Sequence, residues 1–222
     1  MLGLTLDRAE RDRGLRVLAL GAHADDIEIG CGGTVLDLVG RGRVEAATWV
    51  VFSGSEERAA EAKASAAAFL DGVADPTVSV HGFRDGFLPY DGAAVKDVFE
   101  QLKREVDPDV VLTHRGGDAH QDHRLVSELT WNTFRDHLIL EYEIPKYDGD
   151  LGRPNLFVPL AEPTYHRKIE LLQKGFPSQQ GKAWFTEDTF LALMRLRGME
   201  ANAPSRHAEG FFCRKLVLGA GS

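Results

Sequence analysis

One stretch near the N-terminus, residues 15–33 (LRVLALGAHADDIEIGCGG), constrains the fold of this chain more than any other. It starts with an apolar run that ends at Gly21, and a cluster of imidazole and carboxylate side chains follows at once. A glycine-rich run comes next, and from Thr34 the pattern is helical. This order predicts a buried strand, a polar loop and a helix, and open parallel sheets bind ligands outside the carboxyl ends of their strands. The polar cluster, which is therefore expected to lie where such a fold carries out its chemistry, consists of His23, Asp25, Asp26 and Glu28.

Predicted strands and helices alternate along most of the chain. Apolar and β-branched runs predict strands at residues 15–22, 44–52, 77–80, 109–113, 138–144 and 210–218. Helical spacing and helix propensity predict helices at residues 32–40, 56–70, 93–106, 122–136, 163–176 and 186–197. Residues 147–163 are rich in Gly, Asp, Asn and Pro and are expected to form a long loop. The alternation predicts a Rossmann-like α/β fold with a mostly parallel sheet and helices on both faces, formed as a single domain by residues 1–222.

Length and composition argue against several classes of protein. With 222 residues, 43% of them hydrophobic, the chain can form one domain with a substantial core. A formal net charge of −8 disfavours general binding of nucleic acid or of anionic membranes. No apolar run approaches the roughly 20 residues of a membrane span, and residues 1–14 lack the apolar core of a signal peptide. Cys31 and Cys213 are far apart in sequence, which favours a reducing cytoplasm over a disulfide framework.

Two polar constellations, HADD (residues 23–26) and DAHQDH (residues 118–123), each follow a predicted strand. Because both strands belong to one sheet, the two constellations can converge at the same edge. Together they supply imidazole and carboxylate groups, and a catalytic zinc ion usually has three such protein ligands and an open position. Taken singly, each constellation could instead cap the helix that follows it. Two of them, each after a strand, favour a metal site.

The glycine-rich run at residues 30–33 (GCGG) permits a nucleotide-binding interpretation, but the signal is weak. The dinucleotide fingerprint needs its glycines directly after the strand, in the order G-x-G-x-x-G, and here the polar cluster intervenes. Close packing of the helix against the sheet explains these glycines more simply, and Cys31 is expected to pack as a small apolar residue.

The sequence AHADDIEIGCGGT, together with HQDH further along, resembles the LmbE/PIG-L family of zinc-dependent N-acetylglucosaminyl de-N-acetylases. The usual opening of the family is A-H-P-D-D-x-E-x-G-x-G-G-T, and this chain has Ala24 in place of the proline, which removes no ligand. The similarity covers nearly the whole chain, since it continues at residues 56–58, 84–86 and 208–211.

The resemblance implies roles for individual residues. His23, Asp26 and His123 would hold zinc, or another divalent metal at the same place, and Asp25 would act as the general base. His120 would steady the developing oxyanion or donate a proton. These roles agree with the chemistry, because zinc polarises an amide carbonyl and a carboxylate beside the metal can accept a proton from water.

Arg58, Asp85 and Asp118 are the expected substrate contacts. Arg58 and Asp85 should lie in loops after the second and third strands and border the same pocket, where a polar sugar needs paired hydrogen-bond partners. An exposed salt bridge explains either residue equally well. Some relatives have a tyrosine at the position of Asp118, so the role of that tyrosine does not transfer directly. Weaker candidates for the site are His81, His114 and His207.

The sequence thus predicts a cytoplasmic enzyme that uses zinc to remove an N-acetyl group from a small-molecule substrate, an N-acetylglucosamine-like sugar or sugar conjugate. Two alternatives stay open: hydrolysis of another small-molecule amide, and a nucleotide- or sugar-binding module that keeps the fold without the reaction. Residues 141–160 are expected to carry substrate specificity or to form a subunit contact. The resemblance and the apolar, proline-bearing stretch at residues 156–163 also favour a homo-oligomer.

Overall fold

Seven strands form one sheet in the computed structural model, which describes residues 3–6 and 13–217. Their order across the sheet is β3-β2-β1-β4-β5-β7-β6. The first five strands run parallel, and β7 is antiparallel to both β5 and β6. The strands are β1 (Leu15–Gly21), β2 (Val44–Ser53), β3 (Asp75–Phe83), β4 (Val110–His114), β5 (Leu138–Tyr142), β6 (Leu156–Pro159) and β7 (Ala208–Phe212). Because the strand order reverses between β1 and β4, the topological switch point lies between these two strands.

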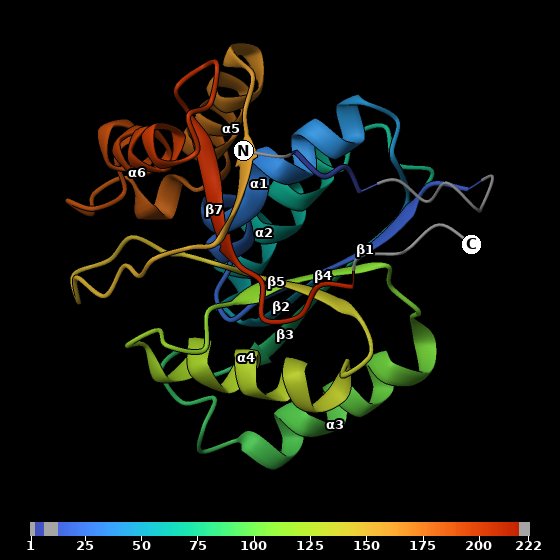
Figure 1. The fold of residues 1–222 in the computed structure, drawn as a ribbon. Coiled ribbons are helices and arrows are strands. Elements are labelled where there is room, and N and C mark those ends of the chain that lie inside the picture. The colour runs from blue at the N-terminus through green and yellow to red at the C-terminus, as the bar shows by residue number, and fades with distance from the viewer. Residues whose placement is uncertain (1–2, 7–12, 218–222) are drawn as a thin grey trace.

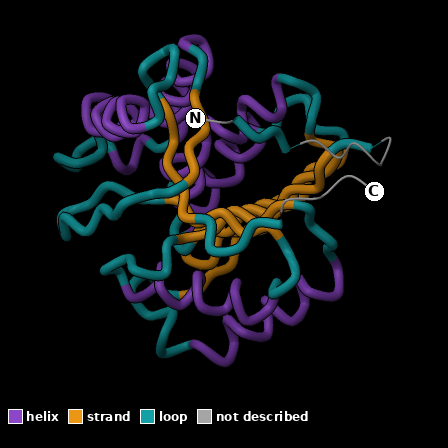
Figure 2. Tube along the Cα trace, in the orientation of Figure 1, coloured by secondary structure: helices purple, strands orange, loops and turns teal. Residues whose placement is uncertain are grey.

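Helices cover both faces of the sheet (Figure 1). One face carries α1 (Asp26–Gly40), α2 (Glu56–Phe69), α5 (Glu162–Gly175) and α6 (Glu187–Glu200), with the short 3₁₀ helix η1 (Pro177–Gln179) before α6. The other face carries α3 (Gly92–Glu105) and α4 (Gln121–Thr133). Figure 2 shows the strands between these two layers of helices. The predicted α/β class, with a mostly parallel sheet and helices on both faces, is confirmed. Within residues 3–6 and 13–217, no helix is both long and apolar enough to span a membrane.

Alternate residues of the central strand β1 contribute to two separate core layers. Val17 and Ala19 belong to the core under α1, α2 and α5, whereas Leu18 and Leu20 belong to the core under α3 and α4. A parallel strand that is buried on both faces has a continuous apolar sequence, which is why β1 is evident without a structure. The amphipathic helix α3 buries one apolar face, formed by Val95, Phe99 and Leu102, and the spacing of these residues is likewise evident from the sequence.

Helix α1 begins at Asp26, so its predicted start near Gly32 is wrong. The glycines at residues 30–33 are helical and let neighbouring side chains approach the helix backbone closely. A Cβ atom at Gly30 would lie 2.2 Å from Tyr142 Cδ2, and one at Gly33 would lie 2.4 Å from Leu160 Cδ1. Asp26 therefore lies in the first turn of a helix rather than in a loop, and its backbone is fixed.

The predicted long loop at residues 147–163 is also wrong, because β6 lies within it. β6 pairs with β7, with Phe157 opposite Gly210, and forms one edge of the sheet. β7 ends at Phe212, so the strand predicted at residues 210–218 begins and ends too late; residue 218 itself lies outside the described residues. β3 is longer than predicted. The other predicted helices and strands agree with the structure to within a few residues.

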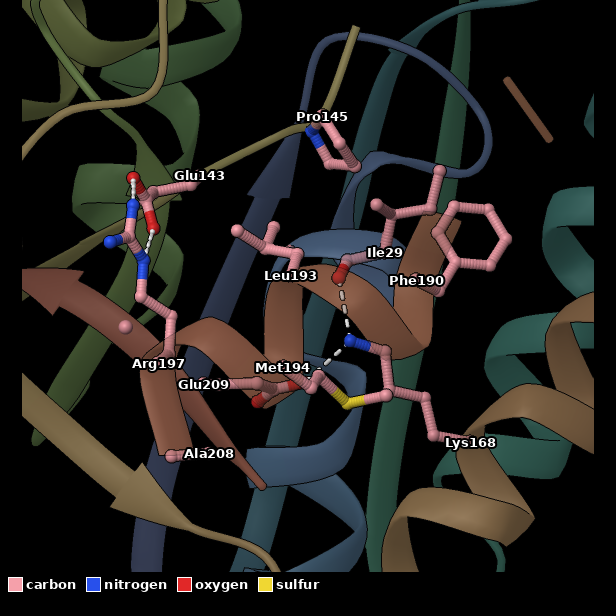
Figure 3. Close-up of a pocket in the computed structure, with 12 residues that line it drawn as sticks. Ile29, Glu143, Pro145, Lys168, Phe190, Leu193, Met194, Arg197, Ala208 and Glu209 are labelled. Carbon is pink, nitrogen blue, oxygen red and sulfur yellow. Dashed lines mark hydrogen bonds and ion pairs between the residues drawn. The ribbon is translucent and has the colours of Figure 1, made fainter. Parts of the chain in front are cut away.

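A buried carboxylate near the end of the chain fastens α1 in place. Glu209 of β7 accepts hydrogen bonds from the backbone N–H groups of Gly33 and Thr34, at 2.8 and 2.7 Å. Lys168 of α5 lies 2.7 Å from Glu209 and also donates to the carbonyl of Ile29 at 2.6 Å, as Figure 3 shows. Both charges are buried, so removing either one would leave the other uncompensated.

Candidate active site and metal centre

The polar residues of the two constellations gather at the carboxyl edge of the sheet, where β1 and β4 end side by side. His23 and Asp25 follow β1, and Asp26 is the first residue of α1. His120 lies in the turn after β4, and His123 lies in the first turn of α4. This is the switch point of the sheet, the usual ligand-binding position of open α/β folds.

His23, Asp26 and His123 have ring nitrogens and carboxylate oxygens close to one another. His23 Nδ1 lies 3.1 Å from His123 Nε2 and 3.3 Å from Asp26 Oδ2, and His123 Nε2 lies 3.5 Å from Asp26 Oδ1. A tetrahedral zinc ion with bonds of about 2.0–2.1 Å keeps its ligand atoms about 3.3 Å apart. The spacing and the donor types of these three side chains therefore fit such an ion.

Further side chains extend this cluster. Three overlapping sets have potential ligand atoms within 4.8 Å of one another: His23–His120–His123, Asp26–His114–His123 and His23–Asp85–Asp122. The first two sets share His123. The third lies on the other side of the His23 ring, because Asp85 Oδ1 and Asp122 Oδ2 are 3.1 and 3.3 Å from Nε2 rather than Nδ1.

The surroundings of the cluster shift the pKa values of its carboxylate and imidazole groups. Burial favours neutral Asp26, but the imidazoles of His123, His114 and His23 hold its pKa well below the ordinary value. Burial and the neighbouring His114 lower the pKa of His123, so its ring is neutral and has a lone pair to offer. Burial also opposes the charge on His23, but Asp26 and Asp122 raise the pKa of this ring well above its ordinary value. A metal ion would displace that proton.

Asp25 is next to Asp26 in sequence but has a different partner. Asp25 Oδ2 lies 3.0 Å from Arg58 Nη2. Within the described residues its side chain makes no capping hydrogen bond to α1, so capping does not account for it. Burial raises the pKa of Asp25, and the Arg58 guanidinium opposes this rise. Asp25 is thus a buried carboxylate beside the metal cluster, held by an arginine.

His120 caps α4, as the alternative interpretation of its constellation proposed. Its Nδ1 accepts a hydrogen bond from the backbone N–H of Asp122 at 3.2 Å. In the neutral ring the proton is then on Nε2. Burial, with His123 and His23 nearby, lowers the pKa of His120. Its ring lies edge-on to that of His23, with the centroids 4.8 Å apart, so a neutral N–H donor borders the cluster.

His114, only a weaker candidate from sequence, lies inside the cluster. It is the last residue of β4 and is fully buried. Its Nε2 accepts a hydrogen bond from the backbone N–H of Ala22 at 3.0 Å and lies 3.1 Å from Asp26 Oδ2. The sequence signal that could have identified it is a histidine at the end of a strand that begins with the apolar run Val110, Val111 and Leu112.

Asp122 was considered only as a helix cap, yet it supports the cluster from behind. It accepts hydrogen bonds from the backbone N–H groups of Gly86 and Leu88, at 2.8 and 3.2 Å, and so fixes the loop after β3. Its Oδ2 also lies 3.3 Å from His23 Nε2. A carboxylate on the far nitrogen of a histidine is the usual way in which proteins orient a metal-binding ring.

Arg58 and Asp85 both lie at the border of the cluster. Arg58 is in the first turn of α2 rather than in the preceding loop, and it also contacts Glu61 Oε2 at 2.9 Å and Ser178 Oγ at 3.2 Å. Asp85 Oδ1 lies 3.1 Å from His23 Nε2, and the side chain of Asp85 is 77% exposed. Asp85 is therefore open to solvent, whereas Arg58 is engaged by the protein.

Asp118 lies behind His123 and is buried. Its Oδ2 is 3.1 Å from His123 Nδ1 and accepts a hydrogen bond from Lys146 Nζ at 2.9 Å, and its Oδ1 accepts one from the backbone N–H of His120. Although burial favours the neutral form, His123 and Lys146 hold the pKa of Asp118 well below its ordinary range. None of these contacts supports the predicted role of Asp118 as a substrate contact, which stays a prediction.

The other two weaker candidates lie outside the cluster. His81 stacks on Phe52, with the ring centroids 5.9 Å apart, and His207 stacks on Tyr165, with the centroids 4.0 Å apart. Both rings have packing partners of their own.

An α/β sheet with a buried histidine and aspartate cluster at its switch point defines a class of proteins with a candidate metal-dependent active site. Within this class, residues 18–134 match the family model of PIG-L, GlcNAc-PI de-N-acetylase. The match spans just over half of the chain and includes all of the residues predicted as metal ligands, catalytic residues and substrate contacts. The chain belongs to the PIG-L family, which confirms the resemblance of its sequence. No curated protein matches the chain.

Several solved structures share the fold over most of the chain. A conserved protein from Thermus thermophilus has a TM-score of 0.71 at 21% identity, covering 93% of this chain and 97% of the other. N,N'-diacetylchitobiose deacetylase from Pyrococcus horikoshii has a TM-score of 0.65 at 22% identity, covering 89% and 83%. The 4-carboxy-2-hydroxymuconate hydratase GalB from Pseudomonas putida has a TM-score of 0.73 at 17% identity, covering 94% and 99%. Because a deacetylase and a hydratase both have this fold, the fold alone does not determine the reaction.

Proposed function

We propose that this protein is a zinc-dependent hydrolase that removes an N-acetyl group from an N-acetylglucosamine-like sugar or sugar conjugate. The observation that carries the proposal is the convergence of His23, Asp26 and His123, with the separate carboxylate of Asp25 beside them. Membership of the PIG-L family, described as GlcNAc-PI de-N-acetylase, supports this substrate class. The fold shared with N,N'-diacetylchitobiose deacetylase agrees with it.

In the proposed mechanism His23, Asp26 and His123 hold the metal ion. When bound, zinc supplies a Lewis acid that polarises the amide carbonyl and makes water more acidic. Three protein ligands leave room in the coordination sphere, as catalytic zinc sites require.

Asp25 acts as the general base. It accepts the proton of the attacking water and passes this proton to the amine that leaves. Burial raises the pKa of Asp25, which makes its carboxylate a stronger base, and the Arg58 guanidinium opposes this rise. Arg58 also holds the carboxylate in place through the 3.0 Å ion pair.

His120 stabilises the charge that develops on the amide oxygen. Its Nδ1 is engaged in capping α4, so its Nε2–H is the group that donates. A preorganised donor of this kind stabilises the transition state more than the substrate. Arg58 and the exposed Asp85 border the cluster and are the residues that we propose to contact the sugar.

A binding module on the same fold is the alternative from another class. Such a module would not need Asp25 beside a complete set of metal ligands, so the set favours catalysis. We further propose that the protein acts in the cytoplasm as a homo-oligomer. Cys31 and Cys213 are both free thiols, which agrees with a reducing compartment.

The test combines metal analysis with acetate release from a panel of N-acetyl sugars. We expect about one zinc ion per chain, loss of most of the metal in His123→Ala, and retention in the control His166→Ala, whose side chain is on the exposed face of α5. Unchanged metal content in His123→Ala would show that the ligand set is wrong. If the zinc-loaded protein releases no acetate from any sugar but cleaves another small amide, the proposed substrate class is wrong and that amide takes its place.

A further inference from the structure

The carboxylate of Asp118 connects a proposed metal ligand to a chain segment that the mechanism above does not use. Its Oδ2 lies 3.1 Å from His123 Nδ1 and 2.9 Å from Lys146 Nζ. Its Oδ1 accepts a hydrogen bond from the backbone N–H of His120 at 2.8 Å. Both oxygens of this buried carboxylate therefore have protein partners, and one of them lies against the far nitrogen of the metal-binding ring.

Lys146 comes from the segment between β5 and β6. Its ammonium group lies between two carboxylates, since Nζ is also 2.7 Å from each carboxylate oxygen of Asp150. Asp150 in turn accepts a hydrogen bond from the backbone N–H of Ala119 at 2.6 Å. The Lys146 side chain is only 13% exposed, so water screens these contacts weakly. The segment between β5 and β6 is thereby tied to the turn that carries Asp118 and His120.

We propose that Asp118 and Lys146 are positioning residues that set the metal affinity of the site. Asp118 holds the ring of His123 so that Nε2 points at His23 and Asp26, and Lys146 holds Asp118. This inference rests on one part of the proposed function, that His123 binds the metal. Losing the carboxylate partner of a metal-binding histidine typically weakens metal binding about 10–100-fold.

For Lys146, charge and positioning predict effects of opposite sign. Its ammonium group repels a divalent cation, so a Lys146→Met substitution that acted through charge alone would tighten metal binding. If Lys146 acts by holding Asp118, the same substitution weakens metal binding. Lys146→Arg keeps both the charge and the donors and should restore the affinity.

The experiment measures the zinc affinity of chelator-treated protein by competition with a chromophoric chelator. We expect about 10–100-fold weaker binding in Asp118→Asn and a smaller loss in Lys146→Met. The double variant should bind no more weakly than Asp118→Asn alone, because Lys146 acts through Asp118. The control is Lys174→Met, which removes an exposed ion pair with Glu170 on α5 and should leave zinc affinity unchanged. The visible spectrum of the Co²⁺-loaded protein should change in Asp118→Asn and not in the control.

Unchanged zinc affinity and an unchanged Co²⁺ spectrum in a folded Asp118→Asn protein would overturn the inference. If Asp118→Asn does not fold, Lys146→Met decides, since unchanged or tighter binding there contradicts positioning. An unaltered protein that binds no zinc would overturn the proposed function and this inference together. Zinc binding that follows the expected pattern without any deacetylation would overturn only the proposed reaction.

Discussion

Asp25 and Asp26 follow one another in sequence, yet their carboxylates have different partners. Asp25 pairs with the cation of Arg58, whereas Asp26 faces the imidazoles of His23, His114 and His123. The change of partner follows from the start of α1, which turns successive side chains in different directions. The two residues should therefore respond differently when each loses its charge.

The first prediction is that Asp25→Asn lowers kcat about 10²–10⁴-fold, the usual loss on removing a general base. KM and zinc content should be unchanged, because the proton transfer belongs to the transition state. Asp26→Ala should instead lose zinc. The measurement is zinc stoichiometry with steady-state kinetics, and the control is Asp37→Asn, further along α1, where Asp37 pairs with Arg41. Full activity in Asp25→Asn would contradict the general-base mechanism. If Asp25→Asn loses zinc and Asp26→Ala keeps it, Asp25 is the metal ligand and Asp26 is the general base.

A second prediction concerns Glu28, a fully buried carboxyl in the first turn of α1. Burial raises the pKa of Glu28 from 4.5 to about 8 in the folded protein. Between these values the folded chain keeps a proton that the unfolded chain releases, so this group lowers the free energy of unfolding as pH rises. Glu28→Gln has no proton to lose in this range. The free energy of unfolding of this variant, relative to that of the unaltered protein, should therefore increase with pH by up to about 1.4 kcal/mol per pH unit.

Urea unfolding of the metal-free protein at several pH values between 5 and 8 measures this difference. The control is Glu57→Gln, an exposed carboxyl in the first turn of α2. If the free energy of unfolding depends on pH in the same way for Glu28→Gln and for the unaltered protein, Glu28 ionises normally in the folded state.

Parts of the site depend on contacts between residues that are far apart in the sequence, and these contacts could not be predicted from the sequence. His23, Asp26 and His123 could be proposed as ligands because they belong to a family motif. The place of His114 in the cluster depends instead on β4 ending beside β1, and that pairing is a property of the sheet. The contact of Asp118 with Lys146 likewise joins two parts of the chain that no local pattern relates.

At the scale of elements, the packing of α1 depends on glycines, which let neighbouring side chains approach its backbone closely. The ring of Tyr142 occupies the space that a Cβ atom at Gly30 would take, and its hydroxyl is fixed by donating to the carbonyl of Leu20 at 2.6 Å. The ring therefore has little freedom to move aside.

The third prediction is that Gly30→Ala destabilises the protein by about 1–3 kcal/mol, the usual cost of overpacking a core. The gain of helix propensity, about 0.5–1 kcal/mol, is too small to offset this loss. Gly40→Ala, at the end of the same helix, is the matched control, because within 4 Å of its Cβ position there is no described atom other than those of its chain neighbours and the nearby helix backbone. It should leave stability unchanged or raise it slightly. Chemical denaturation of both variants is the measurement, and equal stabilities would contradict the packing argument.

The same glycines explain why the start of α1 was misplaced. Glycine lowers helix propensity, so Gly30, which directly follows the polar cluster, makes the first turns of α1 resemble a loop when only local preferences are considered. β6 departs from the prediction for a related reason, since its four residues lie in a stretch rich in Gly, Asp and Pro and gain their structure by pairing with β7. In contrast, β1, β2 and β4 are buried along most of their length and could be predicted from their apolar sequences.

For the molecule as a whole, the sheet has two edges, β3 and β6. An edge strand presents backbone groups that can pair with another chain. β6 coincides with part of the stretch at residues 156–163 for which a subunit contact was expected.

The fourth prediction is that the protein forms a homo-oligomer through the β6 edge. Light scattering should give a multiple of the 24.4 kDa chain mass. Phe157→Lys should shift the mass toward the monomer, because charged side chains on an edge strand disfavour pairing. Thr77→Lys on the opposite edge, where Thr77 is exposed, is the control and should not change the mass. A monomeric mass for the unaltered protein at working concentration would contradict the prediction.

The contact between Glu209 and α1 also has a consequence for biosynthesis. A growing chain is made from its N-terminus, so His23, Asp26 and His123 have all been synthesised well before Glu209. Until β7 is added, the backbone N–H groups of Gly33 and Thr34 lack the carboxylate that accepts from them in the finished fold. The proposed ligands therefore exist in the nascent chain before the carboxylate that fastens the helix bearing Asp26.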